Sequence, residues 1–140
     1  MTVYKSIFLD TAPVIYYLQN DERYFDRIKP FFRSLHISRA KFFVSDITIE
    51  EYLVYPYRIN ADELVDDFFD FLKFGKMTVL HINSDIACEA AKIRAKYKGF
   101  KAMDAFQLAM AKSENIELFL TNDKQLLQFK EMNCKIVDEL

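Results

Sequence analysis

Four acidic residues in this sequence combine a residue type and a spacing that suit metal-ion chemistry. Asp10 directly follows the short apolar run SIFL, and Asp123 follows a second apolar run that ends in Thr-Asn. Glu51 lies one to two turns into a predicted helix, and Asp104 begins an Ala-rich helix. Ligands of open parallel sheets bind beyond the carboxyl ends of the strands, so we expect the four side chains to meet at that edge.

A cluster of four carboxylates requires a counter-charge. At an effective dielectric constant of about 20, two such charges a few ångströms apart repel by on the order of several kcal/mol. A divalent cation removes this repulsion, and an all-oxygen ligand set without His or Cys favours Mg²⁺ or Mn²⁺ over zinc. Such an ion lowers the pKa of a bound water and neutralises charge that develops on a phosphodiester. The acids therefore predict metal-dependent phosphoryl chemistry, with hydrolysis as the expected reaction.

Each acid alone also has a simpler explanation. Asp10 with Thr11 fits the start of a helix, and Asp123 fits the cap of a short helix that follows it. Glu51 fits a solvated helix face. Asp104 would gain from the dipole at a helix N-terminus, although it shares its helix face with apolar residues. It is the shared location at one sheet edge that favours a functional site.

The elements that would position these acids alternate along the chain. Five strands are predicted, at residues 3–9, 41–45, 77–81, just before Asp123, and 134–137. Apolar spacings predict helices after residue 11, at 22–39, 47–55, 61–74 and 84–97, from Ala102, and at 124–129. Strands that alternate with helices, without a hairpin signal, indicate a parallel sheet covered on both faces. The prediction is one α/β domain over residues 1–140, with three layers and a central parallel sheet of about five strands.

Several residues are expected to begin, bend or end these helices. Thr11 is a candidate N-cap, with Pro13 in the first turn, where a missing N–H costs little. Pro30 lies inside the second predicted helix and is expected to kink or split it. Pro56 is expected to end the third. The Phe-rich helix that follows is expected to be bounded by Asn60 as N-cap and Gly75 as C-terminal stop.

Composition restricts how this chain would meet a nucleic acid. Its 19 Lys and Arg against 21 Asp and Glu give a net charge of −2. A near-neutral chain does not bind nucleic acid through bulk charge, so any contact must come from a local patch or a metal. The candidate phosphate contacts are Arg58, Lys98, Lys101 and Lys124.

The remaining reactive residue types suggest no other chemistry. Cys88 and Cys134 form no CxxC, which favours a reduced, cytoplasmic protein over one held by a disulfide. His36 and His81 match no zinc-binding spacing and are expected at the surface or at strand ends. No apolar run approaches the length of a membrane span.

At this point the sequence resembles the PIN domain, specifically the VapC-like toxin ribonucleases. IFLDTAPVIYYL is similar to the first strand of that family, with its acid at Asp10. SDITIEEYL is similar to the second motif, where the acid six residues after the Ser is the ligand, which selects Glu51 over Glu50. AAKIRAKYKGFKAMDAFQLAMAKSENIELFLTND is similar to the third and fourth motifs, giving Asp104 and Asp123. The resemblance spans essentially the whole chain, in the right order and spacing.

The resemblance implies a Mg²⁺- or Mn²⁺-dependent endoribonuclease that leaves 5′-phosphate and 3′-hydroxyl ends. It implies that Asp10, Glu51, Asp104 and Asp123 are the metal-binding and catalytic residues. It further implies a toxin held inactive by a cognate antitoxin, and a possible homodimer. Four residues of this chain match the polar positions beside the family's acids: Thr11, Ser45, Thr121 and Asn122. The resemblance implies that they support the metal ligands from an outer shell or position the phosphate.

Other functions remain as alternatives. A PIN-like module that only binds its partner would keep the fold and lose one or more acids, and this chain keeps all four. A nuclease of RNA processing, or one that acts on DNA, would carry the same acids. An aspartyl-nucleophile phosphatase would have a second Asp two residues after Asp10, where this chain has Ala12, and a receiver domain would have further acids beside the first strand.

Overall fold

A computed structural model of the chain describes residues 3–140. Its centre is a parallel sheet of five strands in the order β3-β2-β1-β4-β5. The strands are β1 (Ser6–Leu9), β2 (Lys41–Ser45), β3 (Thr78–Leu80), β4 (Leu118–Thr121) and β5 (Cys134–Ile136). The helices are α1 (Thr11–Leu18), α2 (Phe25–Ile37), α3 (Asp46–Arg58), α4 (Asp62–Phe74), α5 (Ser84–Lys96) and α6 (Ala102–Ser113), with short 3₁₀ turns η1 (Lys124–Gln128) and η2 (Val137–Glu139).

The central strands are buried on both faces, which explains their unbroken apolar sequences. In β1, Ile7 and Leu9 point into one hydrophobic cluster while Phe8 points into the other. The neighbouring strand β4 repeats this alternation, and Phe119 stacks on Phe8 at a centroid distance of 5.2 Å. Two-sided burial of this kind is typical of parallel sheets.

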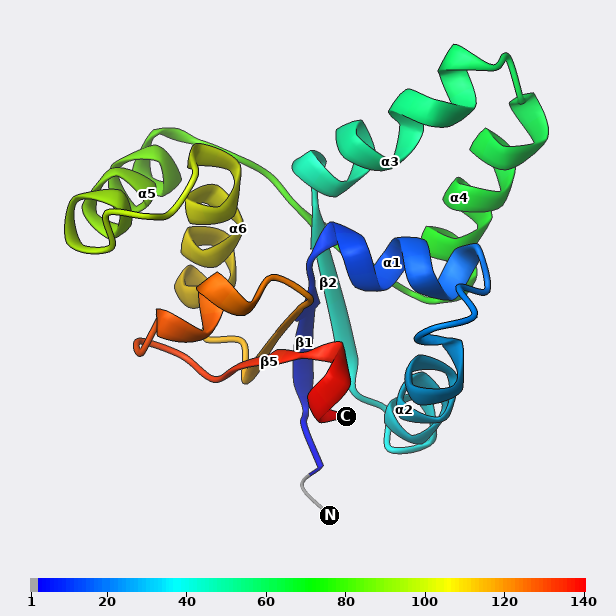
Figure 1. Ribbon diagram of the computed structural model, residues 1–140, viewed down its shortest axis with the longest axis horizontal. Helices are drawn as coiled ribbons and strands as arrows, with labels where there is room; N and C mark the ends of the chain where they lie inside the picture. Colours follow the sequence, from blue (N-terminus) through cyan, green and yellow to red (C-terminus); the bar gives the residue numbers. More distant parts are fainter. Residues whose placement is uncertain (1–2) are drawn as a thin grey trace.

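Helices cover the two faces in unequal numbers. The cluster with Ile7 also contains residues of α1 to α4, and the cluster with Phe8 contains residues of α5, α6 and η1. Figure 1 shows these two groups on opposite sides of the sheet, with α5 and α6 at the left. The predicted three-layer α/β fold with five parallel strands is therefore confirmed.

The structure corrects several predicted boundaries. Pro30 does not split its helix, because α2 runs unbroken through it. Pro56 does not end α3, which continues to Arg58. The N-cap of α4 is Ala61, while Asn60 adopts φ 53° in the preceding turn, a left-handed conformation that Asn tolerates. The predicted helix at 124–129 is the 3₁₀ turn η1.

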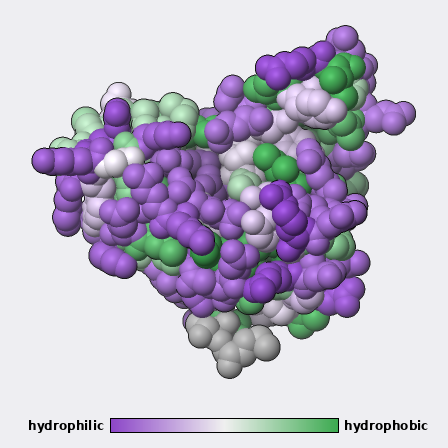
Figure 2. Space-filling model, in the orientation of Figure 1, coloured by the Kyte–Doolittle hydropathy of each residue, from purple (hydrophilic) through white to green (hydrophobic). Residues whose placement is uncertain are grey.

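The Phe-rich helices α2 and α4 each contribute aromatic residues to the core. Phe32 and Phe68 are almost fully buried, whereas Phe69 and Phe74 are exposed. Other apolar side chains are exposed where α3 passes into α4, among them Ile59 and Leu64. In Figure 2 this end of the molecule is at the upper right, where green hydrophobic atoms reach the surface.

Candidate active site

Asp10 occupies the carboxyl end of the central strand β1. Its backbone N–H donates to the carbonyl of Leu120 at 2.9 Å, so the residue is fixed beside the end of β4 as well. The carboxylate accepts hydrogen bonds from the backbone N–H of Thr11 at 2.9 Å and the hydroxyl of Thr121 at 2.8 Å. It is thus Asp10, and not Thr11 as predicted, that caps α1. The cap and a functional role are compatible, since a carboxylate oxygen that accepts a hydrogen bond keeps further acceptor capacity.

The environment of Asp10 opposes its ionised form. Dense protein surroundings raise the pKa of this carboxyl, and the nearby charge of Glu51 raises it further. Hydrogen bonds from Thr121, Thr11 and Gln107 act in the opposite direction because they stabilise the carboxylate. The net pKa is raised, which is the behaviour expected of a carboxylate that lacks a full counter-charge.

The end of β4 supplies a second acid and two polar neighbours. The buried Thr121 hydroxyl donates to Asp10 and accepts the backbone N–H of Asp123 at 3.1 Å. Asp123 is exposed and caps η1 by accepting the N–H of Gln125 at 3.0 Å. The Asn122 amide turns the other way and donates to the hydroxyl of Tyr16 at 2.9 Å. Thr121 therefore joins the two acids, whereas Asn122 is held against α1.

Glu51 reaches the same edge from α3. One carboxylate oxygen accepts the Thr11 hydroxyl proton at 2.7 Å, and this hydroxyl lies 3.2 Å from that of the fully buried Thr48. Glu50 lies on the same helix and exerts none of the main influences on the neighbouring acids. Of the two residues, only Glu51 acts on the neighbouring acids, and its role as a metal ligand, which the motif implies, stays a prediction.

Asp104 lies in the first turn of α6, and its pKa links it to the other three acids. The pKa of Asp104 is raised to about 6, first by burial and then by the charges of Asp10, Asp123 and Glu51, in that order. Lys101, at the N-cap of the same helix, lowers it in part. The fold therefore brings the four predicted acids into one electrostatic neighbourhood.

This neighbourhood is not a finished coordination shell. Within residues 3–140, no three Asp, Glu, His or Cys side chains stand in an arrangement that would hold a metal ion without adjustment. The Glu51 carboxylate is directed at Thr11, but it is exposed, so packing does not lock its rotamer. All donors at the edge are oxygens, which suits a hard cation such as Mg²⁺ or Mn²⁺. The chemistry of this donor set therefore fits such an ion.

Two residues of the edge were missed from sequence. Gln107 is 1% exposed, and its amide lies between Ser45, Thr48 and Asp10. The sequence feature that could have identified Gln107 is its position one helical turn after Asp104, on the same face of α6. No such feature identifies Thr48, because a buried Thr in an apolar helix has no distinguishing sequence pattern. Ser45, which was predicted, accepts the N–H of Ile47 at 3.1 Å and caps α3.

The sequence matches the model of the PIN domain family over residues 7–132. The chain belongs to the PIN domain family. No curated protein matches it. No helix within residues 3–140 combines the length and apolar character of a membrane span.

Solved structures share the fold of this PIN domain. A DNA-bound VapBC from Salmonella typhimurium is similar with a TM-score of 0.76 at 19% identity, over 94% of this chain and 98% of that chain. FitAcB from Neisseria gonorrhoeae gives a TM-score of 0.73 at 19% identity, over 96% and 99%. A toxin–antitoxin complex from Klebsiella pneumoniae gives 0.68 at 20% identity, over 90% and 94%. At these identities the similarity concerns the fold alone.

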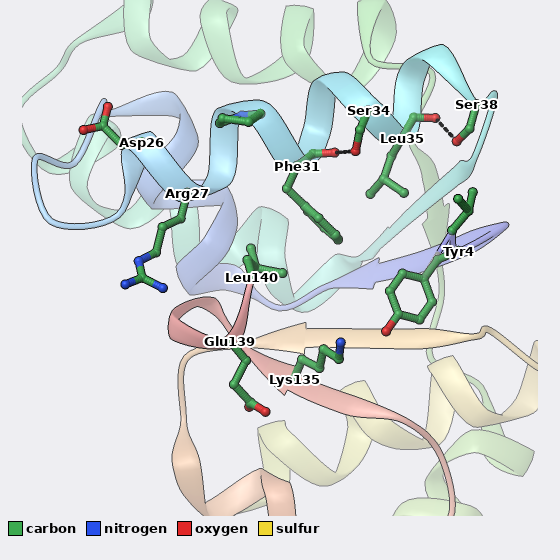
Figure 3. Close-up of a pocket in the computed structure, with 12 residues that line it drawn as sticks. Tyr4, Asp26, Arg27, Phe31, Ser34, Leu35, Ser38, Lys135, Glu139 and Leu140 are labelled. Carbon is green, nitrogen blue, oxygen red and sulfur yellow. Dashed lines mark hydrogen bonds between the residues drawn. The ribbon is translucent and has the colours of Figure 1, made fainter. Parts of the chain in front are cut away.

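A groove on the surface of this PIN domain lies away from the acids. This groove of about 700 Å³ opens between α2 and the C-terminal segment, and none of the four acids lines it. Figure 3 shows Phe31 and Leu35 of α2 facing Tyr4 and Leu140 across it. Its charged rim is partly engaged already, since Arg27 donates to the carbonyl of Asp138 at 2.6 Å. This groove is therefore separate from the candidate active site.

The cysteines and histidines of the PIN domain make their contacts away from the four acids. Cys88 is exposed and Cys134 is half-buried, and both are free cysteines. His81 is exposed and pairs with Asp46 at 2.9 Å, and His36 packs against Phe42. Both histidines thus have surface or strand-end roles, as predicted.

Proposed function

We propose that this PIN domain is a metal-dependent endoribonuclease and the toxin of a toxin–antitoxin pair. The observation that carries the proposal is the position of Asp104, whose pKa is raised first by burial and then by the charges of Asp10, Asp123 and Glu51. Four carboxylates gathered at the carboxyl edge of a parallel sheet are a costly arrangement without a cation. Their retention in this PIN domain supports a catalytic role over a binding-only module.

In the proposal, Asp10, Glu51, Asp104 and Asp123 hold Mg²⁺ or Mn²⁺ through their carboxylate oxygens. When bound, such an ion supplies a water of lowered pKa and a positive charge beside the scissile phosphate. Asp10 is held in place by its backbone contact with Leu120, so it defines the position of the site. The pKa of Asp104 is raised to about 6 by burial and by the neighbouring acids, so a bound cation would strongly affect its ionisation.

The polar neighbours of the acids would fix the orientation of the carboxylates. Thr121 donates to Asp10, and Thr11 donates to Glu51, so these hydroxyls would hold the two carboxylates in fixed orientations while acceptor capacity remains on each for an ion. Ser45 acts through Gln107. Asn122 points toward Tyr16, so its proposed role is to position phosphate only after a rotation of its amide. The first three residues therefore suit an outer shell better than Asn122 does.

The proposed substrate is RNA, cut to leave 5′-phosphate and 3′-hydroxyl ends. Three exposed cations border the acids: Lys101 precedes α6, Lys124 follows Asp123, and Lys98 lies in the turn between α5 and α6. The side chain of Gln125 donates to the carbonyl of Gly99 at 2.9 Å and so ties this turn to η1. Within residues 3–140 none of the three lysines forms an ion pair, which leaves their charges available for phosphates.

The proposed partner is a cognate antitoxin, and the proposed location is the cytoplasm. Toxin–antitoxin complexes share the fold of this chain, which supports such a partner. Exposed apolar side chains near Ile59 and Leu64 are available for a protein contact, with an antitoxin or a second copy of this chain. Two free cysteines agree with a reducing compartment.

Substitution of Asp104 by Asn tests the proposed function. The variant keeps the size of the side chain and removes its charge, so we expect a folded protein whose Mn²⁺-dependent cleavage of RNA falls by more than roughly 100-fold, beyond the loss typical of an outer-shell partner. The assay measures cleavage of defined single-stranded RNAs by purified protein with and without Mn²⁺. A DNA strand of the same sequence, assayed in parallel, distinguishes the DNA-directed alternative.

The matched control is Glu50→Gln, which removes one exposed charge on the helix that carries Glu51. This variant should cleave at nearly the wild-type rate, whereas Glu51→Gln should be strongly impaired. Wild-type activity in Asp104→Asn would refute the proposed site. Absence of cleavage by the wild type, together with retained antitoxin binding, would instead favour the binding-only module.

A further inference from the structure

The buried amide of Gln107 lies at the centre of the polar side chains behind the acids. It comes from the middle of α6 and contacts residues of β2, α3 and the end of β1. Its amide nitrogen lies 3.2 Å from the Thr48 hydroxyl and 3.4 Å from the Asp10 carboxylate. Its carbonyl oxygen accepts the Ser45 hydroxyl proton. One side chain thus connects the elements that carry Asp10 and Glu51.

The orientation of this amide is fixed by its partners. Ser45 accepts the backbone N–H of Ile47, so its hydroxyl proton is available to donate to the Gln107 carbonyl. With the amide reversed, the carbonyl oxygen would face the Asp10 carboxylate and two acceptors would repel. The Gln107 NH₂ group is therefore held toward Asp10 and Thr48.

The same reasoning gives a direction to the rest of the chain of hydrogen bonds. The single hydroxyl proton of Thr11 is donated to Glu51 at 2.7 Å. Thr48 must then donate to Thr11, since Thr11 has no second proton, and it accepts from Gln107. Along this chain each group therefore donates to the next: Gln107 to Thr48, Thr48 to Thr11, and Thr11 to Glu51. Gln107 donates directly to Asp10 at the longer distance of 3.4 Å.

We propose that Gln107 is a positioning residue that fixes the orientation of the Asp10 and Glu51 carboxylates for binding a metal ion. Its NH₂ group supplies donors on both branches, directly to Asp10 and through Thr48 and Thr11 to Glu51. Donors favour the ionised form of a carboxylate and direct its remaining lone pairs toward a cation. This inference rests on the proposed function and adds a residue to which the family resemblance gave no role.

Gln107→Met tests this role. Met is similar in length and volume and has no N–H donor, so it fills the site while removing both branches. We expect the dissociation constant for Mn²⁺, measured by titration calorimetry, to increase by about tenfold or more, as is typical of outer-shell partners. At saturating Mn²⁺ we expect kcat for RNA cleavage to fall with little change in KM, because the substrate contacts remain.

The matched control is Leu108→Met, which alters the next buried position of α6 without removing a hydrogen bond. It should bind Mn²⁺ with the wild-type dissociation constant. If Gln107→Met folds without metal and also binds Mn²⁺ like the wild type, the inference is wrong and Gln107 is only a packing residue. If that variant does not fold, Thr48→Val decides, since it interrupts only the branch to Glu51; unchanged Mn²⁺ affinity there would overturn the inference.

The wild-type protein separates the two proposals. A wild type that binds no Mn²⁺ and cuts no RNA refutes the metal-dependent function and this inference with it. A wild type that binds Mn²⁺, together with a Gln107→Met variant of equal affinity, refutes the inference alone. Weakened affinity in both Gln107→Met and Thr48→Val, but not in Leu108→Met, supports it.

Discussion

Asp104 is the residue whose titration should be visible in the stability of the metal-free protein. Its pKa rises from 3.8 to about 6 on folding, first through burial and then through the charges of Asp10, Asp123 and Glu51. A carboxyl with a raised native pKa stabilises the fold while it is protonated in both states. That contribution is present below about pH 4 and is lost as the pH rises through about 6.

We therefore predict that Asp104→Asn is more stable than the wild type at pH 7 without metal, and that this difference shrinks toward pH 4. Urea unfolding between pH 4 and pH 8 in the presence of a chelator measures it. Asp21→Asn is the control with the opposite sign, because the neighbouring Arg23 lowers the pKa of Asp21 and its contribution is lost as the pH falls. A wild type as stable as Asp104→Asn across this range would contradict the proposed crowding of charge.

At this scale the sequence predicted charged groups better than neutral ones. Asp104 stood out because an acid beside apolar residues requires an explanation, Asp10 because it directly follows a strand, and Glu51 through its place in a motif. Gln107 and Thr48 were not, since a neutral polar residue in a helix is compatible with a surface face, and only their buried contacts distinguish them. Asn122 illustrates the opposite case, where its motif suggested a role but its amide contacts Tyr16.

Among the elements, the strands agreed with the sequence more closely than the helix ends did. Two-sided burial leaves β1, β2 and β4 as apolar runs with clear limits. Helix ends depend on tertiary contacts as well as on propensity, which is why the prolines in α2 and α3 did not stop their helices. Pro56 is itself buried, so packing offsets the hydrogen bond that it cannot make.

Pro30 is exposed inside α2, and this leads to a prediction for that helix. Pro30→Ala restores an N–H that can donate to the carbonyl of Asp26. An interior proline costs about 3 kcal/mol or more in a helix, while its restriction of the unfolded chain returns up to about 1 kcal/mol. We expect the free energy of unfolding to increase by about 2 kcal/mol, measured by urea denaturation at pH 7.

Pro13→Ala serves as the comparison for the same substitution. Pro13 is buried in the first turn of α1, where the backbone N–H has no intrahelical partner to lose. The change should therefore destabilise the protein, by about 1 kcal/mol through the unfolded chain alone. Equal effects of the two substitutions would show that α2 accommodates Pro30 without cost.

For the whole molecule, the net charge is near neutral, so the positions of the cationic side chains say more about RNA binding than their number does. The chain carries a net charge of −2, yet three lysines without an ion pair among residues 3–140 border the acidic edge, at positions 98, 101 and 124. Three other exposed lysines precede or begin strands at the opposite, amino edge of the sheet, at positions 5, 41 and 76. This difference was accessible from sequence only after the strand ends had been assigned, because which edge a lysine occupies depends on the topology.

We predict that replacing Lys98, Lys101 and Lys124 together by Gln weakens the binding of single-stranded RNA and lowers its salt dependence. Each lost phosphate contact reduces the slope of log affinity against log salt by about 0.7, so three contacts should reduce it by about 2. Fluorescence anisotropy with Asp104→Asn as the background avoids cleavage during the titration. The same triple replacement at Lys5, Lys41 and Lys76 changes the net charge equally and should leave the slope unaltered. Equal losses in both triple variants would mean that RNA responds to the overall charge, whereas a loss confined to the first places the RNA backbone across the edge that carries the acids.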